Sequence, residues 1–128
     1  MSKVVLDASA LLALLSQEAG AQRLTPELLS DAVASTVNLA EVQAKLVREG
    51  EDPDMAWKVI LASGPNAEPF TSDQAKTAGA LVKQTRPLRL SLGDRACLAL
   101  AMTVGAPVYT TDRSWKHLKL GIEINLLR

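Results

Sequence analysis

Short apolar runs alternate along this chain with longer segments in which apolar residues recur every three or four positions. The short runs predict β-strands, and the longer spacing predicts amphipathic helices. Strands are predicted at residues 3–6, 32–35, 68–70, 107–110 and 122–126. Helices are predicted at residues 10–17, 38–49, 53–63, 72–86 and 92–104, with shorter helical pieces on either side of Pro26 and at residues 114–118.

Short polar residues stand where several of these helices begin, and such side chains accept hydrogen bonds from a first helical turn. The candidate caps are Ser9, Asn38, Asp52 and Ser91. Glycine or proline follows some of the helices and would stop them, as Gly50 and Pro87 do.

Helical segments separate successive strands, and this order predicts an α/β fold with a parallel sheet that is covered on both faces. Pro69 cannot donate a hydrogen bond to a central ladder, so residues 68–70 are expected at an edge of the sheet. The helix at residues 92–104 is apolar on every side and is expected to be buried. The chain contains no repeat or linker, and we predict one domain over residues 1–128.

Composition narrows the class of protein. Hydrophobic residues make up 48% of the 128 residues, enough for one core without disulfides. The only cysteine, Cys97, lies in an apolar stretch. A single cysteine cannot form an internal disulfide, which fits a reducing, cytoplasmic environment. No apolar run reaches the roughly 20 residues that span a membrane, and Asp7 interrupts the first run too early for a signal peptide. Secretion and membrane insertion are therefore not expected.

Four acidic residues stand where a parallel sheet would gather them. Asp7 and Asp112 each end an apolar run, and Glu41 and Asp94 fall in the first turns of predicted helices. Ligands of open parallel sheets bind beyond the carboxyl ends of the strands, where the following helices begin. Carboxylates gathered there would repel one another unless a divalent cation joined them, so we expect a hard cation held by oxygen ligands.

Each acid also has a purely local interpretation. Asp7 could cap the first helix, although Ser9 is equally suited, and Asp112 could cap the helical turn at residues 114–118. Asp94 follows Ser91 by three residues, as the acid of a capping box does.

Glu41 stands in the same relation to Asn38, and a helical wheel places it on a solvated face beside Lys45. Taken locally, a solvated capping role explains Glu41 better than a catalytic one. Convergence of the four acids on one edge of the sheet is what favours a common site.

The net charge is zero, from 14 basic and 14 acidic residues, which does not indicate a strong nucleic-acid binder. If a metal neutralises the four clustered acids, 14 basic and 10 acidic residues remain and leave a charge of +4. A metal-loaded form could then hold a phosphate backbone that the metal-free form repels.

Four segments carry a resemblance to a known family. They are residues 4–12 (VVLDASALL), 35–42 (STVNLAEV), 90–99 (LSLGDRACLA) and 107–115 (PVYTTDRSW). With these acids in this order, the chain resembles PIN-domain proteins, and most closely the VapC-type toxins of bacterial toxin–antitoxin pairs. The resemblance implies a three-layer α/β/α fold with a five-stranded parallel sheet, and a cytoplasmic ribonuclease that depends on Mg²⁺ or Mn²⁺.

The resemblance also implies roles for particular residues. The four acids would bind the metal and carry catalysis, and Ser9, Asn38 and Thr111 match small polar residues beside that site. The implied partners are an RNA substrate, a VapB-type antitoxin and a second copy of the chain.

Surplus leucines on two short helices, at residues 11–15, 24, 28 and 29, would offer an apolar contact surface for such partners.

Basic residues beside the acids are candidate phosphate contacts, although pairing with nearby acids explains each of them equally well. They are Lys45, Arg95, Arg113 and Lys116. The only histidine, His117, is expected at the surface. Trp57 and Trp115 are expected to pack or to lie at a subunit interface rather than to stack on bases.

Two rival functions differ in kind. One is a non-catalytic PIN scaffold that binds RNA or protein, and the complete acidic set argues against it. The other is a phosphatase of the haloacid dehalogenase type, which resembles this chain in starting with an aspartate after a first strand. That family has a second aspartate two residues later, where this chain has Ser9.

Overall fold

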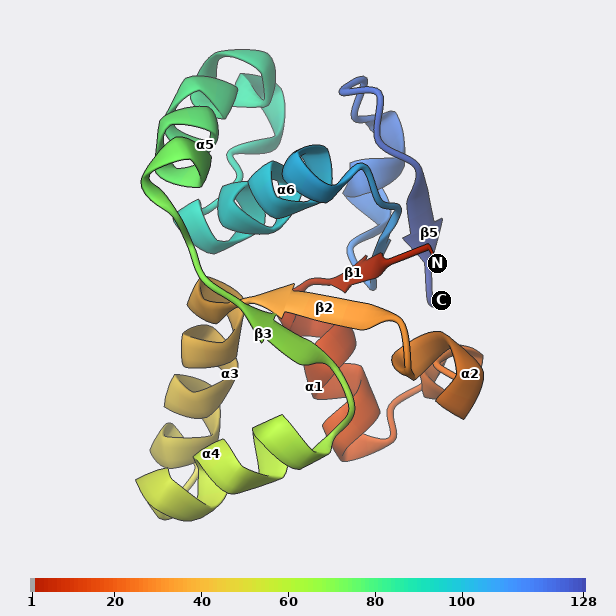
Figure 1. Ribbon diagram of the computed structural model, residues 1–128, viewed down its shortest axis with the longest axis vertical. Coiled ribbons are helices and arrows are strands. Elements are labelled where there is room, and N and C mark those ends of the chain that lie inside the picture. The colour runs from red at the N-terminus through yellow and green to blue at the C-terminus, as the bar shows by residue number, and fades with distance from the viewer. Residues whose placement is uncertain (1) are drawn as a thin grey trace.

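A computed structural model describes residues 2–128, and the first residue of the predicted domain, Met1, lies outside it. Five strands form one parallel sheet in the order β3-β2-β1-β4-β5 (Figure 1). The strands are β1 (Val4–Leu6), β2 (Ala32–Ser35), β3 (Asn66–Glu68), β4 (Val108–Thr110) and β5 (Ile124–Leu126). The fold is therefore the predicted α/β class with a five-stranded parallel sheet.

Helices connect the strands as the apolar spacing predicted. The α-helices are α1 (Ala8–Ser16), α2 (Pro26–Leu29), α3 (Thr36–Arg48), α4 (Pro53–Ala62), α5 (Ser72–Gln84) and α6 (Leu92–Val104). Short 3₁₀ helices are η1 (Ala21–Arg23), η2 (Arg86–Leu88) and η3 (Arg113–His117). In the described part of the chain, no helix is both long enough and apolar enough to cross a membrane.

Two helices begin earlier than predicted because other residues cap them. Asp7, rather than Ser9, caps α1 and accepts a hydrogen bond from the Ala10 N–H. Ser35, rather than Asn38, caps α3. The third strand also lies two residues earlier than predicted, although it does occupy an edge of the sheet.

The sheet separates two apolar clusters, since alternate side chains of a strand point to opposite faces. Leu6 of β1 packs with residues of α1, α3 and α4 on one face. Val5 packs with Leu98 of α6 and with Trp115 of η3 on the other face. Figure 1 shows α1, α3 and α4 below the sheet and α5 and α6 above it, which is the three-layer arrangement.

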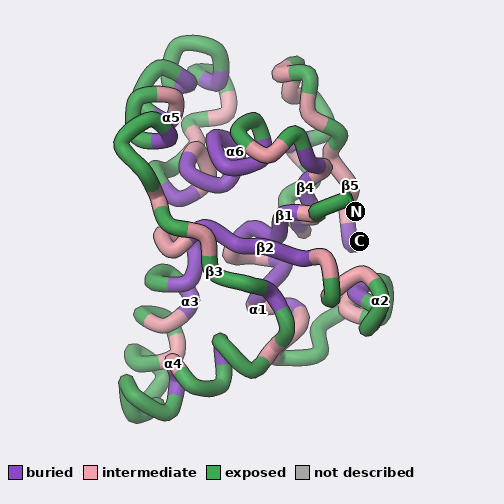
Figure 2. Tube along the Cα trace, viewed as in Figure 1, coloured by how far each residue is buried: buried purple, intermediate pink, exposed green. Residues whose placement is uncertain are grey.

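Helix α6 is buried as its sequence predicted. Every residue from Ala96 to Ala101 is at most 1% exposed, and the helix contacts β1, β2 and β4 (Figure 2). Met102, near its end, is exposed. Because its sides are covered, polar groups of α6 reach solvent mainly at its two ends.

The order of the strands fixes where a site can form. Strand β1 lies between β2 and β4, and the chain visits β2 before it returns to β4 on the other side. In open parallel sheets such a reversal is where ligands bind, and here it falls at the carboxyl ends of β1 and β4. Asp7 follows β1 directly, and Asp112 follows β4 after one intervening residue.

Candidate active site

Asp7 is the buried centre of this edge. Its side chain is held where β1 passes into α1, and the residue is only 3% exposed. Oδ1 accepts hydrogen bonds from the Ala10 N–H at 2.8 Å and from the Ser9 hydroxyl at 2.7 Å. Oδ2 accepts a hydrogen bond from the Thr110 hydroxyl at 2.6 Å. The carboxylate is thus held by two hydroxyls and one backbone N–H.

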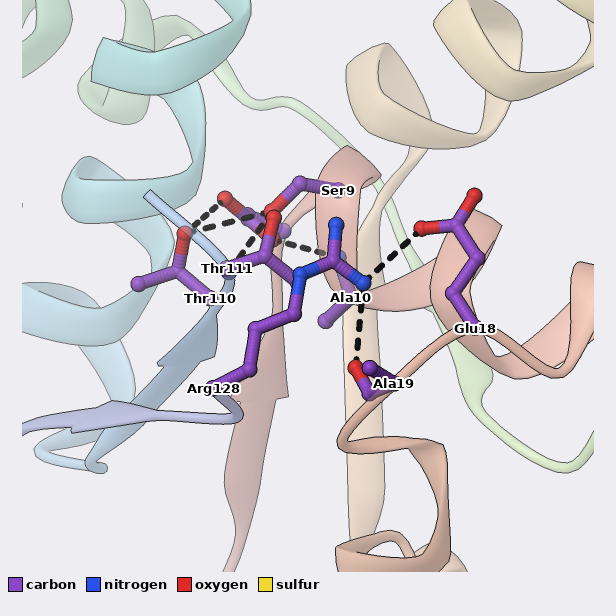
Figure 3. Close-up of polar contacts among 8 residues, drawn as sticks. Ser9, Ala10, Glu18, Ala19, Thr110, Thr111 and Arg128 are labelled. Atoms are coloured by element: carbon purple, nitrogen blue, oxygen red, sulfur yellow. Dashed lines mark hydrogen bonds and ion pairs between the residues drawn. The ribbon is translucent and has the colours of Figure 1, made fainter. Parts of the chain in front are cut away.

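The same two hydroxyls connect Asp7 to the turn that follows β4. The Ser9 Oγ atom accepts a hydrogen bond from the Thr111 N–H at 3.0 Å, and the Thr110 Oγ1 atom accepts one from the Asp112 N–H at 3.0 Å. Figure 3 shows the Ser9, Thr110 and Thr111 contacts side by side. Each Asp7 oxygen is therefore linked through one hydroxyl to one of two successive backbone N–H groups, which fixes Asp7 relative to the turn.

Burial changes the acidity of Asp7. It raises the pKa of the carboxyl from 3.8 to about 6, because the charged form is removed from water, and the charge of Asp94 adds to this effect. Hydrogen bonds from Thr110, Ser9 and Ala10 oppose the rise by stabilising the carboxylate. The site thus holds an ionised Asp7 at neutral pH at a cost in stability.

Asp94 and Asp112 make the local contacts that a capping interpretation predicts. Asp94 is half-buried, and its Oδ2 atom accepts a hydrogen bond from the Ser91 N–H at 3.0 Å, which completes a capping box at the start of α6. Asp112 is exposed and caps η3 through hydrogen bonds from the N–H and hydroxyl of Ser114. Both carboxylates are therefore held by their own helices.

Glu41 has a different environment from the one predicted. With Ser35 as the cap, Glu41 lies in the second turn of α3. Its Oε1 atom accepts a hydrogen bond from the Asn38 amide at 2.9 Å, and its carboxylate lies against Gly93 of α6. Lys45 pairs with Glu49 instead, at 3.6 Å. Glu41 is exposed, as the wheel predicted, yet its head group lies at the junction of α3 and α6.

Three of the four acids lie near enough to Cys97 of α6 for their charges to act on its thiol. Burial first, and then the charges of Asp7, Asp94 and Glu41, raise the pKa of the fully buried Cys97 thiol well above its usual value. Asp112 joins the group through the Thr110 hydroxyl and its own N–H. The structure thus brings the predicted acids to one edge of the sheet.

The donor chemistry of this edge fits a hard cation, since it consists of carboxylate and amide oxygens. The buried Oδ1 atom of Asn38, whose amide nitrogen contacts Glu41, has no hydrogen-bond partner among residues 2–128. Within residues 2–128, however, no three His, Cys, Asp or Glu side chains are grouped as a ready metal site. A cation would have to compete with the capping hydrogen bonds of Asp94 and Asp112.

Thr110 was not among the residues singled out from the sequence. Its neighbour Thr111 was predicted to support the site, but Thr111 contributes its backbone N–H, whereas Thr110 contributes the hydroxyl that contacts Asp7. The usable signal was strand alternation, since Thr110 is two residues after the buried Val108 and points inward with it.

The four predicted phosphate contacts are placed differently from one another. The Arg95 guanidinium donates to the carbonyl oxygens of Ala78 at 2.8 Å and Leu90 at 3.4 Å, so it ties α6 to the region around α5. Lys45 is paired with Glu49, as noted above. Arg113 and Lys116 are exposed on η3, beside Asp112.

Aromatic residues and leucines mostly build the core. Trp115 is fully buried, Trp57 packs against the cluster below the sheet, and His117 is exposed, all as predicted. Of the leucines expected to offer an apolar contact surface, Leu11 and Leu24 are buried, and the others pack against the core while remaining partly exposed. More strongly exposed large apolar side chains lie on α3, α4, α5 and α6, at Val47, Met55, Val59, Leu61, Val82, Leu92 and Met102.

Comparison with known proteins gives a family match over most of the chain. The sequence profile of the PIN domain matches residues 4–120. No curated protein sequence matches the chain.

Solved structures share the fold at low sequence identity. A DNA-bound VapBC complex from Salmonella typhimurium has a TM-score of 0.80 at 16% identity, with all of both chains covered. A toxin–antitoxin complex from Klebsiella pneumoniae has a TM-score of 0.77 at 17% identity, covering 98% of each chain. VapC20 of Mycobacterium tuberculosis, a toxin that cleaves the sarcin–ricin loop, has a TM-score of 0.75 at 19% identity, covering 94% of this chain and 99% of its own.

The raised pKa of Asp7 predicts that its ionisation lowers the free energy of unfolding as pH rises. Between pH 3.8 and about 6 the folded chain holds a proton that the unfolded chain has lost, so the contribution of Asp7 to stability falls as pH rises. We expect metal-free Asp7→Asn to be more stable than the wild type at pH 7, by up to about 3 kcal/mol, and the gap to close towards pH 4. Urea unfolding of both proteins across this range measures the gap, and a gap that does not change with pH would contradict the assignment.

The two hydroxyl links predict a cost for losing Thr110. Thr110→Val keeps the shape but leaves Asp7 Oδ2 and the Asp112 N–H without their partner. We expect a loss of about 2 kcal/mol in the free energy of unfolding at pH 7, since hydrogen bonds to charged groups are among the stronger ones. Thr110→Ser should restore most of it. Thr111→Val is the control and should change stability little, because Thr111 joins the network through its backbone.

Proposed function

Because the chain belongs to the PIN-domain family, we propose that it is a metal-dependent endoribonuclease that acts as the toxin of a toxin–antitoxin pair. The observation that carries this proposal is the buried Asp7 carboxylate at the carboxyl ends of β1 and β4, with Glu41, Asp94 and Asp112 at the same edge of the sheet. Burying a charged group costs stability. A buried carboxylate at the carboxyl edge of a parallel sheet is therefore typical of a functional site.

The four acids would hold Mg²⁺ or Mn²⁺ in this proposal. When bound, such an ion neutralises the carboxylates and the phosphate and lowers the pKa of a coordinated water. Among residues 2–128 no three such ligands are grouped beforehand, so Asp94 and Asp112 would have to give up their capping hydrogen bonds to hold the ion. The oxygen-only donor set is what supports a hard cation rather than zinc.

The protein's own groups orient and anchor the reactants. The Ser9 and Thr110 hydroxyls fix both oxygens of Asp7, so its lone pairs keep one direction at the carboxyl edge of the sheet. Arg113 and Lys116, on the exposed η3 beside Asp112, are the basic residues best placed to bind RNA phosphates. Arg95 is assigned instead to holding α6 against its neighbours, since backbone carbonyls occupy its guanidinium.

The toxin assignment includes partners and location. Several structural neighbours are toxin–antitoxin complexes, which supports a VapB-type antitoxin as partner of this chain. A homodimer and a cytoplasmic location belong to the same proposal. The single, buried, unpaired cysteine supports a reducing compartment.

A non-catalytic PIN scaffold is the alternative. It is favoured by one observation, namely that the carboxylates of Asp7, Asp94 and Asp112 are satisfied as helix caps in the metal-free chain. An aspartyl phosphatase is disfavoured, because the position two residues after Asp7 carries a hydroxyl that donates to Asp7 rather than a second carboxylate. Metal-dependent cleavage separates the first alternative from a nuclease.

Cleavage of RNA tests the enzyme directly. Purified wild-type chain with Mg²⁺ or Mn²⁺ should cleave RNA, and EDTA should abolish the activity. Asp7→Asn and Asp94→Asn should each lower the rate by at least about a hundredfold, because each removes a charged ligand at the reacting phosphate. Glu18→Gln, an exposed acid that pairs with Arg128, is the matched control and should cleave normally. Normal cleavage by Asp94→Asn would favour the scaffold.

The partner proposal predicts mass and metal dependence. Sedimentation at micromolar concentration should give about twice 13.6 kDa for the isolated chain. If the antitoxin places a basic side chain among the acids, its affinity should fall as Mg²⁺ rises and should weaken in Asp7→Asn, through loss of charge pairing. An affinity that is indifferent to Mg²⁺ and to the acids would remove this mode of inhibition while leaving nuclease activity untouched.

A further inference from the structure

The carboxylate of Glu41 occupies the space that a side chain at position 93 would fill. A Cβ atom at Gly93 would overlap both carboxylate oxygens and the Cδ atom of Glu41. Glu41 belongs to α3 and Gly93 to the first turn of α6, so the contact joins two helices that carry different acids of the site. The absence of a side chain at position 93 is therefore what admits the glutamate head group.

Asn38 holds the same carboxylate from the other side. It is only 1% exposed, and its Nδ2 atom donates both to Glu41 Oε1 at 2.9 Å and to the Gly93 carbonyl oxygen at 3.0 Å. Both protons of the amide are thereby used, one on each helix. The reversed orientation of the amide would put its oxygen against a carboxylate and a carbonyl oxygen, so these partners fix which way Asn38 points.

The backbone does not explain glycine at position 93. The residue lies within α6 and has no positive φ, unlike Gly105 at the end of that helix. Alanine is the better helix former in such a position, so glycine there weakens the helix. The requirement met by Gly93 is steric, and the group that imposes it is Glu41.

We propose that Asn38 and Gly93 are positioning residues that form a latch, defined as the amide of Asn38 and the open space at Gly93, which holds the Glu41 carboxylate at the first turn of α6, the turn that carries Asp94. An exposed glutamate on a helix otherwise samples many rotamers, and ordering it has an entropic cost. The latch orders the Glu41 side chain during folding, so that binding of a cation does not have to order it. For its role in metal binding, this inference rests on the proposed function.

The amide oxygen of Asn38, Oδ1, is free to contact a further group beside Glu41. The buried Oδ1 atom has no partner within the described chain. An oxygen of this kind accepts a hydrogen bond from a donor at the site, such as a water that binds beside Glu41.

The latch is tested first without metal. In NMR spectra of the metal-free chain, the side-chain amide protons of Asn38 should shift when Glu41→Ala removes their acceptor, and should shift likewise in Gly93→Ala. Gly79→Ala is the matched control, because Gly79 is also helical and has open space where its Cβ would lie. Asn38 resonances that do not move in Gly93→Ala, or that move equally in Gly79→Ala, would overturn the latch.

The positioning role is tested by calorimetric titration with Mn²⁺. Gly93→Ala should raise the Kd for Mn²⁺ by 10- to 100-fold, as loss of an outer partner of a metal ligand does. Gly79→Ala should leave the Kd unchanged. The double variant Gly93→Ala/Glu41→Ala should bind no more weakly than Glu41→Ala alone, since both changes remove one carboxylate.

The two proposals fail in different ways. Additive losses in the double variant, or wild-type Mn²⁺ affinity in Gly93→Ala, would overturn the positioning role while the nuclease assignment stood. A wild-type chain that binds no Mn²⁺ would overturn the metal dependence, and the NMR comparison would still decide whether the latch exists.

Discussion

The burial of one carboxylate governs the arrangement of the site. Asp7 loses most of its hydration at the end of β1, and three hydrogen-bond donors offset part of that loss. Two of the donors are hydroxyls that in turn accept backbone N–H groups from the turn after β4. The need to satisfy Asp7 therefore fixes the ends of two neighbouring strands, the start of α1 and the position of Asp112 together. Such a network is stabilising only when every member has its partner.

The groups that cap helices at this edge of the sheet are the same groups that are proposed to bind a metal. Parallel strands end where helices begin, so a carboxylate at that edge faces both a helix N-terminus and a cation that binds there. Asp94 makes a capping box with Ser91, yet its charge also acts on Asp7, and Asp112 caps η3, yet it is linked to Asp7 through Thr110. The capping contacts satisfy the acids in the metal-free chain. Local hydrogen bonding and a catalytic role are therefore successive uses of the same oxygens in the proposed enzyme.

Local pattern predicted the elements well and the contacts between them less well. Strand β2, helix α6 and the cap of α4 at Asp52 match their predictions, because each depends on neighbours in sequence. The starts of α1 and α3 were misplaced, since several short polar residues there are equally good caps and only packing selects Asp7 and Ser35. The predicted leucine surface has a related limit, because a wheel counts apolar positions but not the sheet and helices that partly cover them.

The sequence by itself determined the α/β class and the parallel sheet, because the periodicity of apolar residues and the alternation of strands with helices follow from residue type and spacing. The same pattern predicted the four acids at strand ends and helix starts. Tertiary structure decided which oxygens meet. Thr110 rather than Thr111 reaches Asp7, and Glu41 turns towards Gly93 rather than Lys45. These contacts join residues from helices and strands that are far apart in the chain. They form only when packing of the core has brought those elements together.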